Sequence, residues 1–107
     1  MRTEILTIGD EVLEGQTQNT NAAFLGRALS EKGYEIAGHR VAADGHTLII
    51  DSLKEALSRS DFVIATGGLG PTIDDLTKKA AADLFSHTGY NRCRIYVYGN
   101  NKRITCT

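Results

Sequence analysis

The sequence predicts a three-layer α/β domain with a mainly parallel sheet and helices on both of its faces. Three strand-like runs, residues 4–8, 34–42 and 62–65, alternate with three segments in which apolar residues recur at helical spacing. The third run, Phe-Val-Ile-Ala, is continuously apolar, which is typical of a parallel strand covered on both faces. This alternation of strands and helices implies right-handed βαβ units.

The first strand ends at Gly9, and the polar segment from Asp10 to Thr20 is expected to be a loop. Asn19 or Asn21 then starts a helix, because either side chain can accept hydrogen bonds from the unpaired N–H groups of the first turn. Gly33 is a typical stop for this helix. Each of the three helices has an apolar face expected to cover the sheet: Ala22, Leu25 and Leu29; Ile49, Leu53, Ala56 and Leu57; Leu76, Ala80 and Leu84.

The overall composition and charge argue against some classes of binding partner. A chain of 107 residues forms one domain, and its net charge of -1 lacks the basic excess that binds nucleic acid, so no nucleic-acid partner is expected. No apolar run has the length of a membrane span, and the first residues lack the apolar core of a secretory signal. We therefore expect a cytoplasmic location and no membrane partner. Cys93 and Cys106 form no CxxC pair and are expected to be reduced thiols.

Residues 66–72, Thr-Gly-Gly-Leu-Gly-Pro-Thr, form a Gly-rich turn between the third strand and the third helix. Glycines let the main chain approach a ligand closely, and their N–H groups can converge on an anion. Thr72 is placed to cap the following helix, whose positive N-terminal end favours phosphate. The turn has neither the lysine of a P-loop nor the spacing of a dinucleotide fingerprint, so tight packing alone is the alternative interpretation.

Asp74 and Asp75 follow this turn directly. Adjacent carboxylates beside a phosphate site can hold a hydrated divalent cation or accept hydrogen bonds from ligand hydroxyl groups. They can equally stabilise the first helical turn through its dipole. The polar segments 9–20 and 43–47 also follow strands, and ligands of open α/β sheets bind beyond the carboxyl ends of the strands. The topology therefore predicts one ligand site formed by all three segments.

Together these segments resemble the molybdopterin-binding-like domain shared by molybdenum-cofactor biosynthesis proteins and CinA. The run from Thr66 to Lys78, TGGLGPTIDDLTK, resembles the family signature, and residues 8–16 with Asn19-Thr20-Asn21 are similar to the family's first loop. Leu69 is more like the CinA branch, because the molybdopterin proteins usually carry Thr or Ser there. The resemblance covers roughly residues 2–85.

The resemblance implies roles for individual residues. It makes Gly67, Gly68 and Gly70 the backbone cradle of the ligand. Asp44 and Asp75 become the catalytic carboxylates, with Asp75 also the expected ligand of a divalent metal, Mg²⁺. The other residues expected to bind the ligand are Gly9, Asp10, Glu11, Asn21, Thr66, Thr72 and Asp74.

Three functions are open on these grounds. The CinA branch implies a metal-dependent pyrophosphatase that hydrolyses ADP-ribose-like nucleotides. The molybdopterin branch implies chemistry on a pterin, or non-catalytic binding of molybdopterin or a nucleotide, within molybdenum cofactor biosynthesis. The third is an inactive truncated remnant. The small-molecule partner is a nucleotide or a molybdopterin-like ligand in the first two, and homo-oligomers are expected.

The last part of the chain departs from the family pattern. Residues 1–85 are expected to be a partial molybdopterin-binding-like domain, and residues 86–107 an atypical tail that forms an edge strand or a hairpin. Arg94 to Tyr98 is a strand candidate, followed by a turn at residues 99–102. The family's domain is longer and the tail does not resemble its continuation, so the expected fold is incomplete, through truncation or a frameshift.

Overall fold

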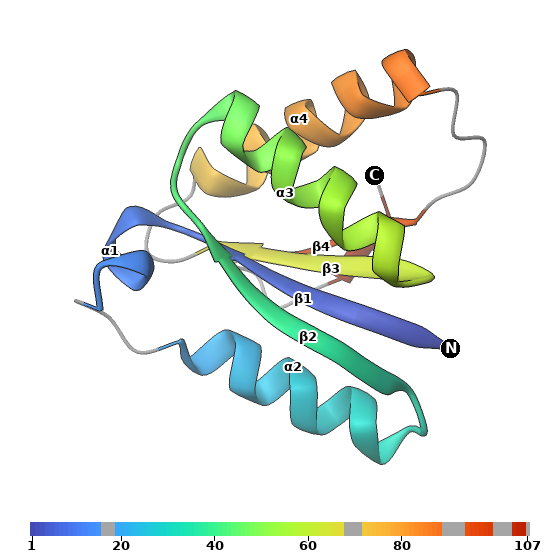
Figure 1. Cartoon of the computed structure of the whole chain (residues 1–107). Coiled ribbons are helices and arrows are strands. Elements are labelled where there is room, and N and C mark those ends of the chain that lie inside the picture. The colour runs from blue at the N-terminus through green and yellow to red at the C-terminus, as the bar shows by residue number, and fades with distance from the viewer. Residues whose placement is uncertain (16–18, 68–71, 89–93, 100–103, 107) are drawn as a thin grey trace.

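Five strands form one sheet in the order β2-β1-β3-β4-β5 (Figure 1). They are β1 (Arg2–Ile8), β2 (Glu35–Ala42), β3 (Phe62–Gly67), β4 (Ile95–Tyr98) and β5 (Ile104–Cys106). Strands β1 to β4 run parallel to one another, and β5 pairs antiparallel with β4. The computed structural model describes residues 1–15, 19–67, 72–88, 94–99 and 104–106, with side chains at all of these except 72–75, 85–88 and 105–106.

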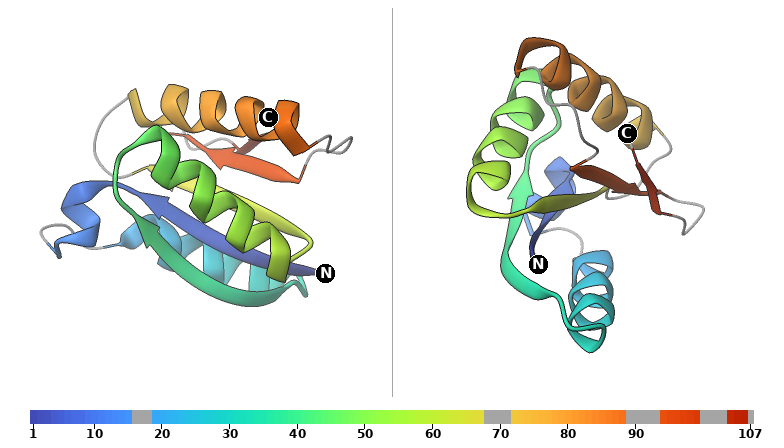
Figure 2. Two further views of the ribbon diagram at one scale, coloured as in Figure 1. Left: turned by 45° about the horizontal axis from the view of Figure 1, so that its top comes forward. Right: turned by 90° about the vertical axis from the view of Figure 1, so that its right-hand side faces the viewer.

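Helices lie on both faces of the sheet (Figures 1 and 2). Helix α2 (Thr20–Glu31) covers one face, and α3 (His46–Arg59) and α4 (Thr72–Thr88) lie side by side on the other. The predicted three-layer α/β architecture is thus confirmed. Within the described ranges, no helix is long and apolar enough to cross a bilayer.

The prediction of a loop after the first strand is wrong for residues 10–13, which form the short helix α1 (Asp10–Leu13). The Leu13 N–H donates to the Gly9 carbonyl at 3.1 Å, and the Glu14 N–H donates to the Asp10 carbonyl at 2.9 Å. The acidic residues Asp10 and Glu11 occupy the first turn, where the helix dipole favours negative charge. A single turn is too short for hydrophobic periodicity to reveal it.

The core between the sheet and the α3–α4 pair is aliphatic and closed. Alternate residues of β1, Leu6 and Ile8, point to this side because side chains of a strand alternate between its faces. Leu53 and Ile49 of α3 are fully buried against them. The other buried members are Ala42, Ala56, Leu57, Val63, Ala65, Ala80, Ala81, Leu84 and Ile95. The helix faces expected from the sequence therefore pack on the sheet.

Glu4 lies on this same side of β1, and its side chain is buried. Arg59 Nη2 donates to Glu4 Oε1 at 2.7 Å, and Arg40 Nε donates to the same oxygen at 3.3 Å. Both arginines also donate hydrogen bonds to Glu55 on α3. These bonds lower the pKa of Glu55, and the bond from Arg40 has the largest effect. The buried Glu4 carboxylate is therefore paired with two arginines in a cluster of four charged residues.

Arg94, directly before β4, ties the last part of the chain to the end of α3. Its guanidinium group donates to the carbonyl oxygens of Leu57 and Ser60 at 2.9 and 2.8 Å, and to that of Asp61 at 2.9 Å. The last carbonyl groups of a helix have no intrahelical partner, and a cation stabilises that end of the dipole. One side chain thus positions β4 beside β3 and caps α3.

Candidate functional site

The loops after β1 and β2 meet at the carboxyl ends of the two strands (Figure 1). The Gly9 N–H donates to the Ala42 carbonyl at 2.9 Å, and the Asp44 N–H donates to Asp10 Oδ1 at 3.0 Å. One bond joins the strand ends, and the other fixes the Asp10 carboxylate on the neighbouring loop. The structure therefore brings together three predicted site residues, Gly9, Asp10 and Asp44.

Three carboxylates make this edge of the sheet electronegative. Partial burial, followed by the nearby charges of Asp10 and Glu11, raises the pKa of Asp44, and a hydrogen bond with the Asp10 backbone offsets part of that rise. A β-carbon at Gly9 would lie 2.9 Å from Glu11 Oε1, so the Glu11 side chain folds back over Gly9. The site therefore favours an occupant that brings positive charge or hydrogen-bond donors.

A second set of contacts ties α2 to the ends of β1 and β3. Asn21 Nδ2 donates to Thr66 Oγ1 at 3.2 Å, and Thr7 Oγ1 donates to Asn19 Oδ1 at 2.9 Å. Thr7 and Thr66 are direct neighbours in the β1–β3 register, and both are buried. Asn21 and Thr66, predicted as ligand-binding residues, thus contact each other at the carboxyl edge.

Thr7 is a member of this arrangement that the sequence reasoning did not single out. Its hydroxyl group orients Asn19, the residue that precedes α2. The sequence does contain a signal for the side on which Thr7 lies. Alternate residues of a strand share one face, so Thr3, Ile5 and Thr7 all point to the α2 side. The distance to residue 19 depends on how α2 folds back, which a local pattern does not give.

The Gly-rich turn is partly within the described residues. Gly67 is the last residue of β3, and Thr72 begins α4. Gly68 and Gly70 lie outside the described residues, as do the side chains of Thr72, Asp74 and Asp75. What the structure places at this edge is the start of α4, a helix of 17 residues whose N-terminal dipole favours an anion.

A divalent metal was expected at Asp75. Among the described residues, no group of three or more His, Cys, Asp or Glu side chains is arranged to hold a metal ion directly. The donor set of Asp10, Glu11 and Asp44 consists of carboxylate oxygens, which is the ligand chemistry of Mg²⁺, an ion that keeps several of its waters. These carboxylates therefore match the donor chemistry of a hydrated Mg²⁺ ion.

Comparisons with known proteins agree with this architecture. A family described as "Probable molybdopterin binding domain" matches residues 4–93. A CinA-like protein of Chlorobium phaeobacteroides is 50% identical over 84 residues, which are 78% of this chain and 20% of that protein. The chain therefore spans about a fifth of the length of such curated relatives.

Two solved structures share the fold. The protein CinA of Thermoplasma acidophilum superposes with a TM-score of 0.71 at 40% identity, covering 79% of this chain and 50% of that one. The molybdopterin biosynthesis enzyme MoaB of Thermus thermophilus superposes with a TM-score of 0.60 at 24% identity, covering 85% of this chain and 65% of that one. The second likeness concerns the fold alone.

Proposed function

Because this chain belongs to the family of probable molybdopterin-binding domains, we propose that its carboxyl-edge loops bind a phosphate-bearing pterin or nucleotide. The observation that carries this proposal is the hydrogen bond from the Asp44 N–H to Asp10 Oδ1 at 3.0 Å. It holds two acidic loops together beside the strand that leads into α4. A ligand with an anionic end and a hydrogen-bond-donating end matches both halves of such a site.

The phosphate half of the proposed site is the start of α4. The first N–H groups of a helix have no intrahelical partner, so they can donate to phosphate oxygens, and the dipole adds to the attraction. The contact between Asn21 and Thr66 holds α2 against β3 next to this helix start. The Gly-rich sequence after Gly67 suits close approach of the main chain.

The other half consists of the carboxylates of Asp10, Glu11 and Asp44, which accept hydrogen bonds. Pterin ring N–H groups and ribose hydroxyl groups are matching donors. Mg²⁺, as part of this proposal, would supply charge neutralisation between the phosphate and the acidic loops. Asp44 and Asp75 are proposed to hold its waters, and a water oriented there would be the nucleophile of a pyrophosphatase.

Binding and hydrolysis are separated by one experiment. ADP-ribose is titrated into the protein by calorimetry with and without Mg²⁺, and AMP formation is followed in the same samples. Binding that weakens at least fivefold in Asn21→Ala, but not in the exposed control Asp51→Asn, supports the proposed site. AMP formed by the wild type and lost in Asp75→Ala supports a pyrophosphatase. Binding without AMP supports a binding module, and no binding of ADP-ribose or of a pterin phosphate contradicts the proposal.

We also propose that the chain forms homo-oligomers in the cytoplasm. Strand β5 lies at one edge of the sheet, and Ile104 is half exposed there. An open edge strand offers unpaired backbone groups to a second chain. Light scattering coupled to size-exclusion chromatography tests this, and a monomer at all accessible concentrations would contradict it.

A further inference from the structure

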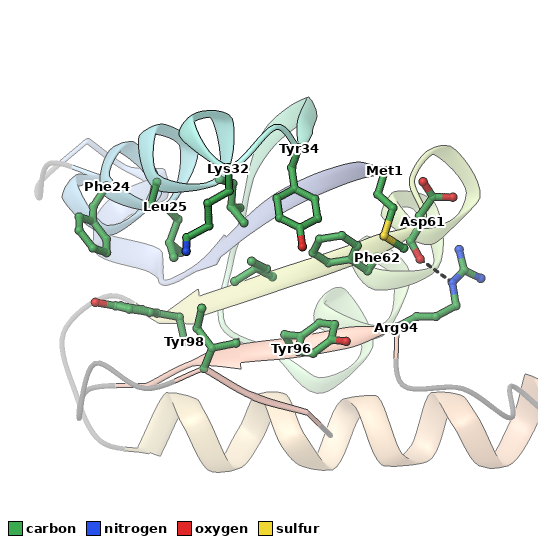
Figure 3. Close-up of a pocket in the computed structure, with 14 residues that line it drawn as sticks. Met1, Phe24, Leu25, Lys32, Tyr34, Asp61, Phe62, Arg94, Tyr96 and Tyr98 are labelled. Atoms are coloured by element: carbon green, nitrogen blue, oxygen red, sulfur yellow. Dashed lines mark hydrogen bonds between the residues drawn. The ribbon is translucent and has the colours of Figure 1, made fainter.

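An open groove runs along the α2 side of the sheet, over β3 and β4 (Figure 3). Its volume is about 880 Å³, and it lies between α2 and the β4–β5 hairpin. Three of the five most exposed large apolar side chains of the described residues line it: Met1, Phe24 and Ile104. Apolar exposure concentrated in one concave surface marks a binding site.

The floor of this groove is aromatic. Tyr34 and Phe62 meet edge to face with ring centroids 5.7 Å apart, and Phe62 meets Tyr96 in the same way at 5.6 Å. Phe24 and Tyr98 form a further contact at 6.1 Å where α2 begins. Such a row of half-buried rings offers apolar area and ring edges to a flat or elongated apolar molecule.

The charged side chains of the groove are Lys32, Arg94 and Asp61. Lys32, which follows α2, extends its side chain over the groove, with its ammonium group above the floor, and the Tyr34 hydroxyl group points into the same space (Figure 3). Lys32 has no ion-pair partner among the described residues. Arg94, at one end, is already bound to three carbonyl oxygens. Asp61, the carboxylate of the lining, accepts a hydrogen bond from the Arg2 N–H at 2.8 Å and lies beside Arg94 at the same end (Figure 3). Lys32 is therefore the cation available to an anionic occupant.

We propose that this groove binds an elongated aromatic molecule that carries one anionic group, with the anion paired to Lys32. The volume lies within the range of about 300–1,000 Å³ that small-molecule sites occupy, and an apolar wall with few convergent polar groups is their usual composition. A second copy of the chain is the competing occupant, and the sedimentation experiment below distinguishes it. None of the carboxyl-edge residues of the proposed phosphate site lines this groove, so the two proposals are independent.

The test compares two dyes with the same ring system. Anilinonaphthalene sulfonate carries one negative charge, and phenylnaphthylamine is neutral. Fluorescence titration is expected to give one site per chain for each dye, with the sulfonate bound more tightly. Lys32→Glu is expected to weaken the sulfonate by roughly fivefold and to change the neutral dye by less than twofold, since an exposed ion pair contributes up to about 1 kcal/mol. Lys54→Glu on α3 is the matched control, because it reverses an exposed lysine on the opposite side of the sheet.

A second variant locates the site. Ala28 lines the groove from α2, so Ala28→Phe is expected to fill the space and weaken both dyes while far-ultraviolet circular dichroism keeps the wild-type spectrum. Equal affinity for the two dyes, or a sulfonate affinity that Lys32→Glu leaves unchanged, would overturn the proposal and leave an unspecific apolar face. Sedimentation showing a dimer that binds dye only after dilution would assign the groove to a second copy instead.

Discussion

The two faces of the sheet use the same strands but bury them differently. On the α3–α4 side, two helices cover the strands, and the core is aliphatic with side chains such as Leu53 and Ile95 fully buried. On the α2 side, one helix covers part of the strands, and the half-buried rings of Phe62 and Tyr96 border an open groove. A parallel sheet is stable with both faces covered. We therefore expect the closed face to contribute more to stability, and the open face is the one proposed to take a ligand.

The largest expected difference between the faces comes from removing one leucine from each. Leu53→Ala opens a cavity in the closed core and is expected to lower the free energy of unfolding by about 3 kcal/mol. Leu29→Ala, on α2 beside the groove, is expected to cost about half as much, because neighbours and water can enter the space from the open side. Urea unfolding of both variants measures the difference. Equal losses would mean that the α2 face is as tightly closed as the other.

The next largest difference in stability is expected between two adjacent residues of β1 whose side chains point to opposite faces of the sheet. Glu4→Ala leaves two partly exposed arginines without their buried partner and is expected to cost about 2 kcal/mol, as for hydrogen bonds to a charged group. Thr3→Val, the control on the α2 side, removes only a hydroxyl group that donates to the Phe62 carbonyl at 3.2 Å, so its expected cost is about 0.5 kcal/mol. Thermal unfolding of both variants tests the order. A cost for Thr3→Val as large as that for Glu4→Ala would contradict it.

Much of the fold is predictable from local pattern. The apolar stripes of α2 and α3 and the continuous apolar run of β3 give the helices, the parallel sheet and its layers, because periodicity and burial are directly coupled in these elements. A candidate site was predictable as a place, since ligands bind at the carboxyl ends of such strands. The contacts between its residues were not predictable. The Asp10–Asp44 and Asn21–Thr66 pairs join residues 34 and 45 positions apart, which no local rule relates.

The groove on the α2 side was not predictable from local sequence either. Tyr34, Phe62 and Tyr96 have the sequence pattern of ordinary sheet-face residues, and each does pack against the α2-side core. Whether such rings are sealed or open depends on how many helices cover that face. That number follows from the connections between strands, and β4 is followed by an antiparallel neighbour rather than by a helix crossover.

A smaller effect is expected at Arg94, which lies at one end of the groove and binds the end of α3 on the closed side. Arg94→Met keeps much of the apolar stem but removes hydrogen bonds to three carbonyl groups, with an expected cost of about 1 kcal/mol. Arg94→Lys should recover part of this loss, because a point charge still favours the end of a helix. Hydrogen exchange is expected to rise at the last turn of α3 and not in α2. Faster exchange throughout both helices would contradict a local role.

The smallest effect is expected at Asp44, at the carboxyl edge where the two faces meet. Burial and the charges of Asp10 and Glu11 raise the pKa of Asp44 in the folded state, so the unfolded chain loses this proton at a lower pH. Ionised Asp44 therefore opposes folding at neutral pH. Asp44→Asn is expected to increase stability at pH 7 by a few tenths of a kcal/mol, a small value because the side chain is exposed.

The gain from Asp44→Asn is expected to shrink as the pH falls, and to vanish below about 3.9, where the carboxyl group is protonated in both states. Urea titrations across this range measure it, with Asp51→Asn as the exposed control on α3. A variant that is less stable than the wild type at neutral pH would show that the Asp44 carboxylate is held by attraction. In that case the contact between the acidic loops would serve stability alone, and the proposed ligand site would lack its electronegative half.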